Sequence, residues 1–142
     1  MILYLDTSAL VKAYVEEEHS RKVLQGMNAA TASASHKVAY VEARAAFARL
    51  QREHVLDDSA WESLKCEFIT DWENYVQIGT TKPLLVHAAE LAEAFALRAY
   101  DSMHLAAAHM LHEQSKEPVI FACYDRRLNQ AAEVLGMRLL EG

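Results

Sequence analysis

The sequence predicts a single α/β domain whose parallel β-sheet is covered by helices on both faces. Residues 2–5 form an unbroken apolar run, which is typical of a strand buried on both sides. Further short apolar runs alternate with segments of helical spacing, and this alternation favours a parallel sheet. The length of 142 residues, 52% of them hydrophobic, suits one domain with a full core.

Apolar spacing and capping residues place the elements in order. Strands are predicted over residues 2–5, 30–35, 75–79, 119–124 and 137–140. Helices are predicted over residues 9–18, 20–27, 37–54, 59–72, 81–95, 101–115 and 125–135. The expected N-caps are Thr7 or Ser8 for the first helix, Ser20 for the second, and Ser59, in an S-x-x-E capping box with Glu62, for the fourth. Gly26 and Gly136 are expected to stop the second and the last helix.

Composition excludes several classes of protein. Four glycines in the whole chain leave no glycine-rich phosphate loop, and 24% charged residues argue against disorder. No run approaches the roughly 18 apolar residues of a membrane span, and the N-terminus lacks the basic region of a signal peptide. Two widely separated cysteines suit a reducing compartment, so we expect a cytoplasmic protein without a membrane partner.

The net charge of −6 is the opposite of what a broad basic nucleic-acid-binding face would give. Any contact with nucleic acid is therefore expected to go through metal ions or a small local patch. Basic residues near the predicted site are either guides for a nucleic-acid backbone or plain solvated charges: Lys12, Lys37, Arg44, Arg98, Arg126 and Arg127. Arg98 also precedes Asp101 by one helical turn, which makes it a candidate ion-pair partner.

Four acidic residues are placed where they predict a shared site. Asp6 and Asp125 each follow a predicted strand, and open α/β sheets bind ligands at the carboxyl ends of their strands. Asp101 begins a helix and can project to the same edge from its first turn. Glu42 shares its helix face with Val38, so its carboxylate needs a cation, a metal or a proton. Taken singly, each aspartate is also explained as an N-cap, and Glu42 by an ion pair with an arginine.

Together the four carboxylates predict a metal site. Carboxylates that converge at one edge repel one another unless they hold a cation. All-oxygen ligands favour Mg²⁺ or Mn²⁺, and Mg²⁺ is often shared with substrate phosphates. The chemistry that follows most directly is metal-assisted hydrolysis of a phosphodiester.

The segments that carry these acids also show a family resemblance. They are LDTSAL at 5–10, Glu42 in the middle of a helix, LRAYDSMHLA at 97–106 and YDRRL at 124–128. In this order they resemble PIN-domain nucleases, and within that family the VapC toxins of VapBC toxin–antitoxin modules. The resemblance spans nearly the whole chain, because its markers run from residue 6 to residue 125.

The resemblance implies a three-layer α/β/α domain over residues 1–142 with a five-stranded parallel sheet. It implies a Mg²⁺- or Mn²⁺-dependent endoribonuclease that is the toxin of a type II toxin–antitoxin module. The implied catalytic and metal-binding quartet is Asp6, Glu42, Asp101 and Asp125, with Asp6 and Asp101 nearest the metal and Ser8 supporting the site. The implied partners are an RNA substrate, a small cognate antitoxin and a second copy of the chain, with a larger complex as a further option.

Other interpretations remain open or are excluded by single residues. A PIN-like module that has lost turnover and binds RNA or a protein is the main alternative. A haloacid-dehalogenase phosphatase needs a second aspartate where Ser8 stands, and a response-regulator receiver needs an early acidic pair. The histidines lack a zinc-binding spacing, and His104, one turn after Asp101, is expected to have a hydrogen-bonded structural role.

Overall fold

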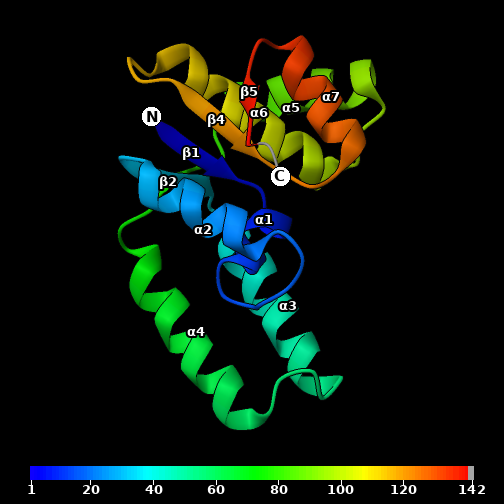
Figure 1. Cartoon of the computed structure of the whole chain (residues 1–142). Coiled ribbons are helices and arrows are strands. Elements are labelled where there is room, and N and C mark those ends of the chain that lie inside the picture. Colours follow the sequence, from blue (N-terminus) through cyan, green and yellow to red (C-terminus); the bar gives the residue numbers. More distant parts are fainter. Residues whose placement is uncertain (141–142) are drawn as a thin grey trace.

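The computed structural model describes residues 1–140, which form a five-stranded sheet between layers of helices (Figure 1). The strands within these residues are β1 (Ile2–Leu5), β2 (Ala32–His36), β3 (Val76–Ile78), β4 (Val119–Ala122) and β5 (Arg138–Leu139). Their order is β3-β2-β1-β4-β5, and every pairing is parallel. The predicted α/β fold with a five-stranded parallel sheet is therefore confirmed.

The helices divide between the two faces of the sheet, as a three-layer α/β/α fold requires (Figure 1). They are α1 (Thr7–Lys12), α2 (Ser20–Ala29), α3 (Val38–Arg52), α4 (Asp58–Trp72), α5 (Lys82–Phe95), α6 (Ala99–Gln114) and α7 (Arg126–Val134). Along β1, Ile2 and Tyr4 pack with α5, α6 and α7, whereas Leu3 and Leu5 pack with α1, α2, α3 and α4. This alternation explains why β1 is apolar throughout, since both of its faces are buried.

Several helix ends differ from the sequence expectations, beginning with those of α1 and α2. The first helix is capped by Asp6, whose side chain accepts a hydrogen bond from Ala9 N–H, and it ends at Lys12 instead of residue 18. After Lys12 the backbone N–H groups of Ala13 and Tyr14 bond three residues back, to Leu10 O and Val11 O, so the helix closes in a tighter turn. Ser20 is the first residue of α2 and not its N-cap, which is His19 in the left-handed conformation.

The other two differences concern Gly26 and the start of α4. Gly26 lies inside α2, where an added Cβ would approach Leu140 Cδ1 to 3.1 Å and Leu3 Cδ2 to 3.3 Å. Its role is thus to let α2 approach the sheet closely, and not to end the helix. The N-cap of α4 is Asp57 and not Ser59, because Asp57 Oδ1 accepts from Ala60 N–H at 2.7 Å.

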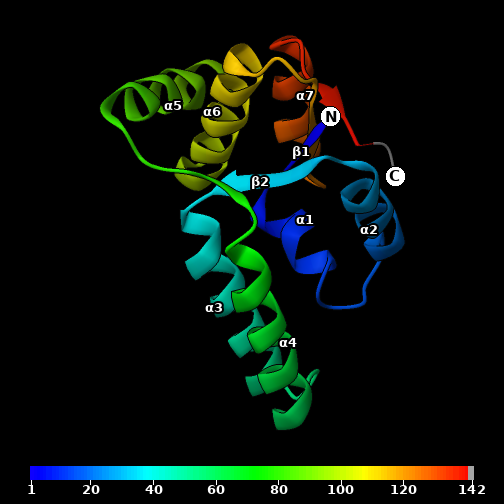
Figure 2. The ribbon, with the colours of Figure 1, turned by 90° about the vertical axis from the view of Figure 1, so that its left-hand side faces the viewer.

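Helices α3 and α4 form an antiparallel pair that extends away from the sheet (Figure 2). Aromatic side chains join the two helices: the rings of Phe47 and Phe68 meet edge to face at 5.6 Å, and Tyr40 packs against Phe68 and Trp72. Among the described residues, no helix is long and apolar enough to cross a membrane.

The strand order places a reversal at the centre of the sheet. From β1 the chain adds β2 and β3 on one side and later β4 and β5 on the other, so the order reverses between β1 and β4. Open α/β sheets bind ligands at such a reversal, outside the carboxyl ends of the strands. The backbone N–H of Asp6 donates to Ala122 O at 3.1 Å, so Asp6 lies beside the end of β4.

The cap of α4 gives a direct test of this local structure. We expect Asp57→Ala to lower the free energy of unfolding by about 1 kcal/mol, because Ala60 N–H loses its acceptor. Ser59→Ala, at an exposed neighbouring position, should change it by less than about 0.5 kcal/mol, and Asp57→Asn should retain most of the cap. Urea unfolding measures all three, and equal losses for the two alanine variants would contradict the assignment.

Candidate functional site

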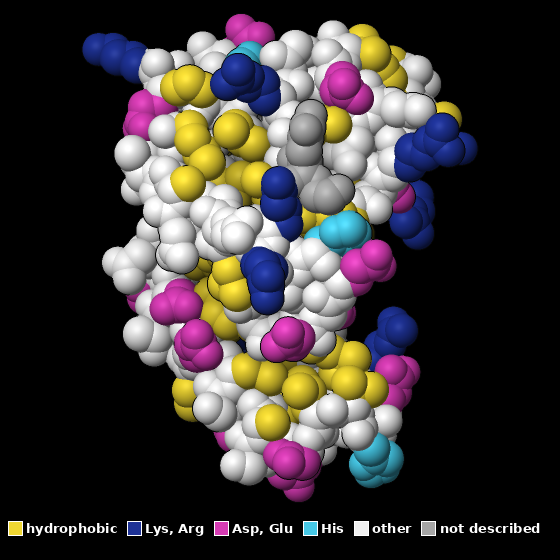
Figure 3. Space-filling model, in the orientation of Figure 1, with side chains coloured by type: hydrophobic (Ala, Val, Ile, Leu, Met, Phe, Trp, Pro, Cys, Tyr) yellow, Lys and Arg dark blue, Asp and Glu magenta, His cyan; other side chains and the backbone are white. Residues whose placement is uncertain are grey.

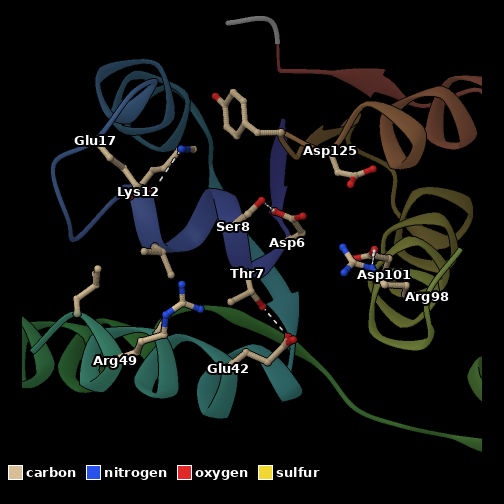
Figure 4. Close-up of a pocket in the computed structure, with 14 residues that line it drawn as sticks. Asp6, Thr7, Ser8, Lys12, Glu17, Glu42, Arg49, Arg98, Asp101 and Asp125 are labelled. Atoms are coloured by element: carbon tan, nitrogen blue, oxygen red, sulfur yellow. Dashed lines mark hydrogen bonds and ion pairs between the residues drawn. The ribbon is translucent and has the colours of Figure 1, made fainter. Parts of the chain in front are cut away.

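A pocket of about 810 Å³ lies at the carboxyl edge of the sheet (Figure 4). All four predicted acidic residues line it: Asp6, Glu42, Asp101 and Asp125. They come from four different elements, since Asp6 follows β1, Asp125 follows β4, Glu42 lies on α3 and Asp101 lies on α6. Thr7 and Ser8, in the first turn of α1, also line the pocket.

Asp6 and Asp125 each combine a helix cap with a place in the pocket. Asp6 is 5% exposed, and its Oδ1 accepts from Ala9 N–H at 2.9 Å and from the Ser8 hydroxyl at 2.8 Å. Asp125 Oδ1 accepts from Leu128 N–H at 2.9 Å and caps α7. The capping interpretation of these aspartates is thus confirmed, and it coexists with the position of both side chains in one pocket.

Asp101 lies in the first turn of α6 but does not begin that helix, which starts two residues earlier, at Ala99. Its Oδ2 is 3.5 Å from Arg98 Nε, so the expected ion pair is confirmed. Burial raises the pKa of Asp101, and the negative charges of Asp125 and Asp6 raise it further, against the opposing effect of Arg98. Because all three side chains line the same pocket, the charges of Asp6 and Asp125 act on the carboxylate of Asp101.

Glu42 is held from two directions. Thr7 Oγ1 donates to Glu42 Oε1 at 2.6 Å, and His104 Nε2 lies 3.1 Å from the same oxygen. Burial acts to raise the pKa of Glu42, but the hydrogen bonds from His104 and Thr7 outweigh it and the net shift is downward. The carboxylate is therefore kept ionised, and its partner is a histidine with a hydroxyl instead of the arginine considered from the sequence.

The chemistry of the pocket fits a hard divalent cation. Its acidic side chains, with the hydroxyls of Thr7 and Ser8, offer oxygen ligands, which suit Mg²⁺ or Mn²⁺. Within residues 1–140, no three His, Cys, Asp or Glu side chains stand close enough together to form a complete protein cage for a metal. Mg²⁺ is usually held by one or two carboxylates and several waters, so an open arrangement of this kind is compatible with it.

Basic side chains border the acidic pocket on part of its rim. Lys12 and Arg98 line the pocket, together with Arg49, which the sequence analysis did not single out. Arg126 and Arg127 line a smaller adjoining pocket of about 370 Å³ that also includes Asp101 and Asp125. In the space-filling view, basic and acidic side chains both border an indentation of the right-hand outline (Figure 3).

Two further basic residues, Lys37 and Arg44, were considered as guides for nucleic acid. Neither belongs to the described lining of the acidic pocket. Arg44 instead lies over the ring of Tyr40, with its guanidinium carbon 5.4 Å from the ring centre, and its Nη1 donates to the Tyr40 hydroxyl. Arg44 therefore has a local role on α3, away from the four carboxylates.

The chain matches the model of the PIN domain over residues 3–134. It belongs to the PIN domain family. Two curated relatives from Mycobacterium tuberculosis are each 32% identical to it over 138 residues, which is 97% of this chain and 94% of theirs. They are named Ribonuclease VapC45, from strain CDC 1551 / Oshkosh, and Ribonuclease VapC49, from strain H37Rv.

Solved structures support the same PIN fold. VapBC2 from Rickettsia felis, bound to a promoter DNA fragment, aligns with a TM-score of 0.66 at 11% identity, covering 98% of this chain and 97% of the other. FitAB bound to IR36 DNA gives 0.70 at 16% identity, with 98% and 93% covered. FitAcB from Neisseria gonorrhoeae gives 0.68 at 16% identity, with 99% and 97% covered.

Tyr4 was not among the site residues predicted for this PIN domain, and Thr7 was predicted only as a possible helix cap. Thr7 contacts Glu42, and Tyr4 contacts His104 with its hydroxyl at 2.8 Å from Nδ1. A signal was present for Tyr4, because a tyrosine in a fully buried strand needs a hydrogen-bond partner for its hydroxyl. The expected hydrogen-bonded role of His104 is confirmed.

The raised pKa of Asp101 yields a stability test on the metal-free PIN domain. A raised folded-state pKa means that ionisation of Asp101 lowers stability, with the loss beginning above the unfolded pKa of about 3.9 and complete above the folded pKa. Asp101→Asn removes this penalty but also loses a carboxylate in the first turn of α6, which is worth about 0.3–1 kcal/mol. We therefore expect an unchanged or higher Tm at pH 7, with any gain shrinking as the pH falls toward about 4.

Thermal melts in EDTA measure this effect. Asp125→Ala is the control, because loss of the cap on Leu128 N–H should cost about 1 kcal/mol. A clear fall in the Tm of Asp101→Asn at pH 7 would show that Asp101 stabilises the fold like Asp125, and the electrostatic interpretation would be wrong.

Proposed function

We propose that this protein is a metal-dependent endoribonuclease and the toxin of a type II toxin–antitoxin module. The observation that carries the proposal is that four carboxylates from four elements line one pocket of a PIN domain. The ribonuclease names of two relatives that align over nearly the whole chain supply the substrate class. Hydrolysis of RNA phosphodiester bonds is the reaction that an oxygen-ligand cation site of this kind supports.

In this proposal, Asp6 and Asp101 hold Mg²⁺ or Mn²⁺ most directly, and Glu42, Asp125 and Ser8 complete the catalytic and metal-binding set. When bound, such an ion polarises a phosphoryl oxygen and lowers the pKa of a bound water. Oδ1 of Asp6 already accepts from Ser8 and from a backbone N–H, which fixes the direction of its carboxylate. Ser8 thus acts on the proposed site by orienting Asp6.

The charge distribution explains how an acidic protein can take an RNA substrate. Four carboxylates repel phosphate until cations neutralise them, so metal would control substrate binding as well as the chemical step. Arg98 is 86% exposed on its side chain and lies beside Asp101, where it can reach a phosphate at the rim. Lys12 lies on the opposite part of the lining and contacts Glu17 at 3.2 Å (Figure 4).

Cleavage of RNA tests the activity. We expect purified protein to cut a structured RNA pool with Mg²⁺ or Mn²⁺ and to lose this activity in EDTA. Asp6→Asn and Asp101→Asn should each reduce the rate at least about 100-fold, because changing groups one step further from a metal already costs 10–100-fold. Gel analysis of end-labelled RNA measures the rate, and His109→Leu, on α6 but outside the described pocket lining, serves as a control for purification and folding.

The main alternative is a PIN domain that binds RNA or a protein without turnover. Metal binding without cleavage of any RNA supplied, including total RNA from a bacterial lysate, would favour this binding function. Cleavage that persists in EDTA or in both aspartate variants would exclude the proposed metal site.

We also propose a small antitoxin as a partner, a homodimer of this chain, and a larger complex with the antitoxin. The structural neighbours VapBC2, FitAB and FitAcB each have a name that joins two proteins, as a toxin and its antitoxin would be named together. Large apolar side chains are exposed on α5, where Leu85 and Val86 are each 49% accessible, as expected for a protein that self-associates.

Light scattering during size-exclusion chromatography tests the assembly. We expect a dimer at micromolar concentration, and Leu85→Glu should shift the population toward monomer if α5 contributes to the interface. A monomer at every concentration up to about 100 times that range would contradict the homodimer.

A further inference from the structure

We propose that His104, accepting at Nδ1 and donating from Nε2–H, is a positioning residue that orients Glu42 in the acidic pocket. Tyr4 in the sheet selects this tautomer through its hydroxyl. The inference rests on the proposed metal-dependent function and deepens it. It adds two buried side chains, Tyr4 and His104, that orient one carboxylate of the site, Glu42.

The direction of each hydrogen bond follows from the groups involved. The Tyr4 hydroxyl oxygen accepts from the backbone N–H of His36 at 3.1 Å and lies 2.8 Å from His104 Nδ1. The phenolic O–H hydrogen needs an acceptor, and because the His36 N–H can only donate, His104 Nδ1 is the acceptor that the described contacts of Tyr4 offer. With Nδ1 as an acceptor, Nε2 of His104 is the donor, and it lies 3.1 Å from both Glu42 Oε1 and Thr7 Oγ1, so its N–H points toward the Thr7–Glu42 pair.

Burial makes this arrangement specific. Tyr4 is 0% exposed and His104 2% exposed, so neither side chain can exchange these partners for bulk water. Burial also raises the pKa of Tyr4 well above its usual value, which keeps its hydroxyl protonated and able to donate. The rings of Tyr4 and His104 meet edge to face at 5.9 Å, which fixes the plane of the imidazole.

These hydrogen bonds hold Glu42 through only one of its two carboxylate oxygens. Both Thr7 Oγ1 and His104 Nε2 contact Oε1, and neither contacts Oε2. The carboxylate is thus anchored through Oε1, and Oε2 is the oxygen that these two bonds leave for other ligands. Figure 4 shows Glu42 joined to Thr7 and placed below Asp6 and Ser8 at the edge of the pocket.

This arrangement differs from that of a general base. A base needs an accessible lone pair, whereas Nδ1 of His104 is occupied by Tyr4 and Nε2 carries the proton toward Glu42. Residues that hold a metal-binding carboxylate in this way typically change metal affinity or activity by 10–100-fold when altered.

The test compares His104→Leu with His104→Gln in the full chain. Leucine has no donor, and we expect it to weaken Mn²⁺ binding by the metal-free protein about 10–100-fold, measured by calorimetry and by Mn²⁺ electron paramagnetic resonance. Glutamine places an amide N–H near the position of Nε2, so its affinity should stay within a few-fold of the wild type. His109→Leu is the matched control, because His109 is another hydrogen-bonded histidine of α6, paired with His87 at 2.8 Å.

Because His104→Leu is a core change, a second measurement is made on the wild type. The ¹⁵N shifts of the His104 ring in the metal-free protein should show a protonated Nε2 and an unprotonated Nδ1. Tyr4→Phe removes the donor to Nδ1 while keeping the aromatic ring, and it should abolish the preference for this tautomer. Protonation of both nitrogens, or of Nδ1 alone, at pH 7 overturns the proposal.

The outcomes separate this inference from the proposed function. If the wild type binds no Mn²⁺ and cleaves no RNA, the proposed function fails first. If the wild type does both and folded His104→Leu binds Mn²⁺ with wild-type affinity, only the positioning role is overturned. Loss in His104→Leu, rescue in His104→Gln and the Nε2–H signature together support it.

Discussion

Four carboxylates line one pocket at the carboxyl edge of the sheet, and their mutual repulsion is the constraint that their local contacts offset. Each carboxylate has a different local partner that stabilises it: backbone N–H groups for Asp6 and Asp125, the Arg98 guanidinium for Asp101, and a histidine with a hydroxyl for Glu42. Asp101 remains the least compensated, since burial and its acidic neighbours still raise its pKa. A cation would relieve the repulsion that these separate partners do not remove.

The two capping aspartates show how one side chain serves both the fold and the site. In Asp6, the capping bond and the bond from Ser8 both use Oδ1, so the group that ends β1 and starts α1 also fixes the direction of the carboxylate. Asp125 repeats this at the end of β4, again through Oδ1. Because β1 and β4 are neighbours at the reversal of strand order, two local capping bonds help to place both carboxylates in the lining of one pocket.

The sequence was sufficient for the strands and for the four acidic positions, because buried apolar runs and strand-to-helix transitions are local patterns. It was less informative for helix ends. Gly26, for example, allows close packing against Leu3 and Leu140, which are distant from it in the sequence. The partners of Glu42 could not be predicted for the same reason. Thr7 is 35 residues away from Glu42, and Tyr4 is 100 residues away from His104. Only the packed layers bring these groups together.

The hydrogen bonds between Tyr4, His104 and Glu42 connect the open pocket to the buried core. Tyr4 belongs to the sheet, His104 to a helix on one face and Glu42 to a helix on the other, so their hydrogen bonds cross all three layers. Each group is nearly or partly removed from water, where an unmade hydrogen bond costs about 1–3 kcal/mol. Sliding one helical layer against the sheet would break at least one of these bonds, so layer packing and the orientation of Glu42 are mechanically linked. A small domain can thereby hold a carboxylate in place at a pocket that is itself open to solvent.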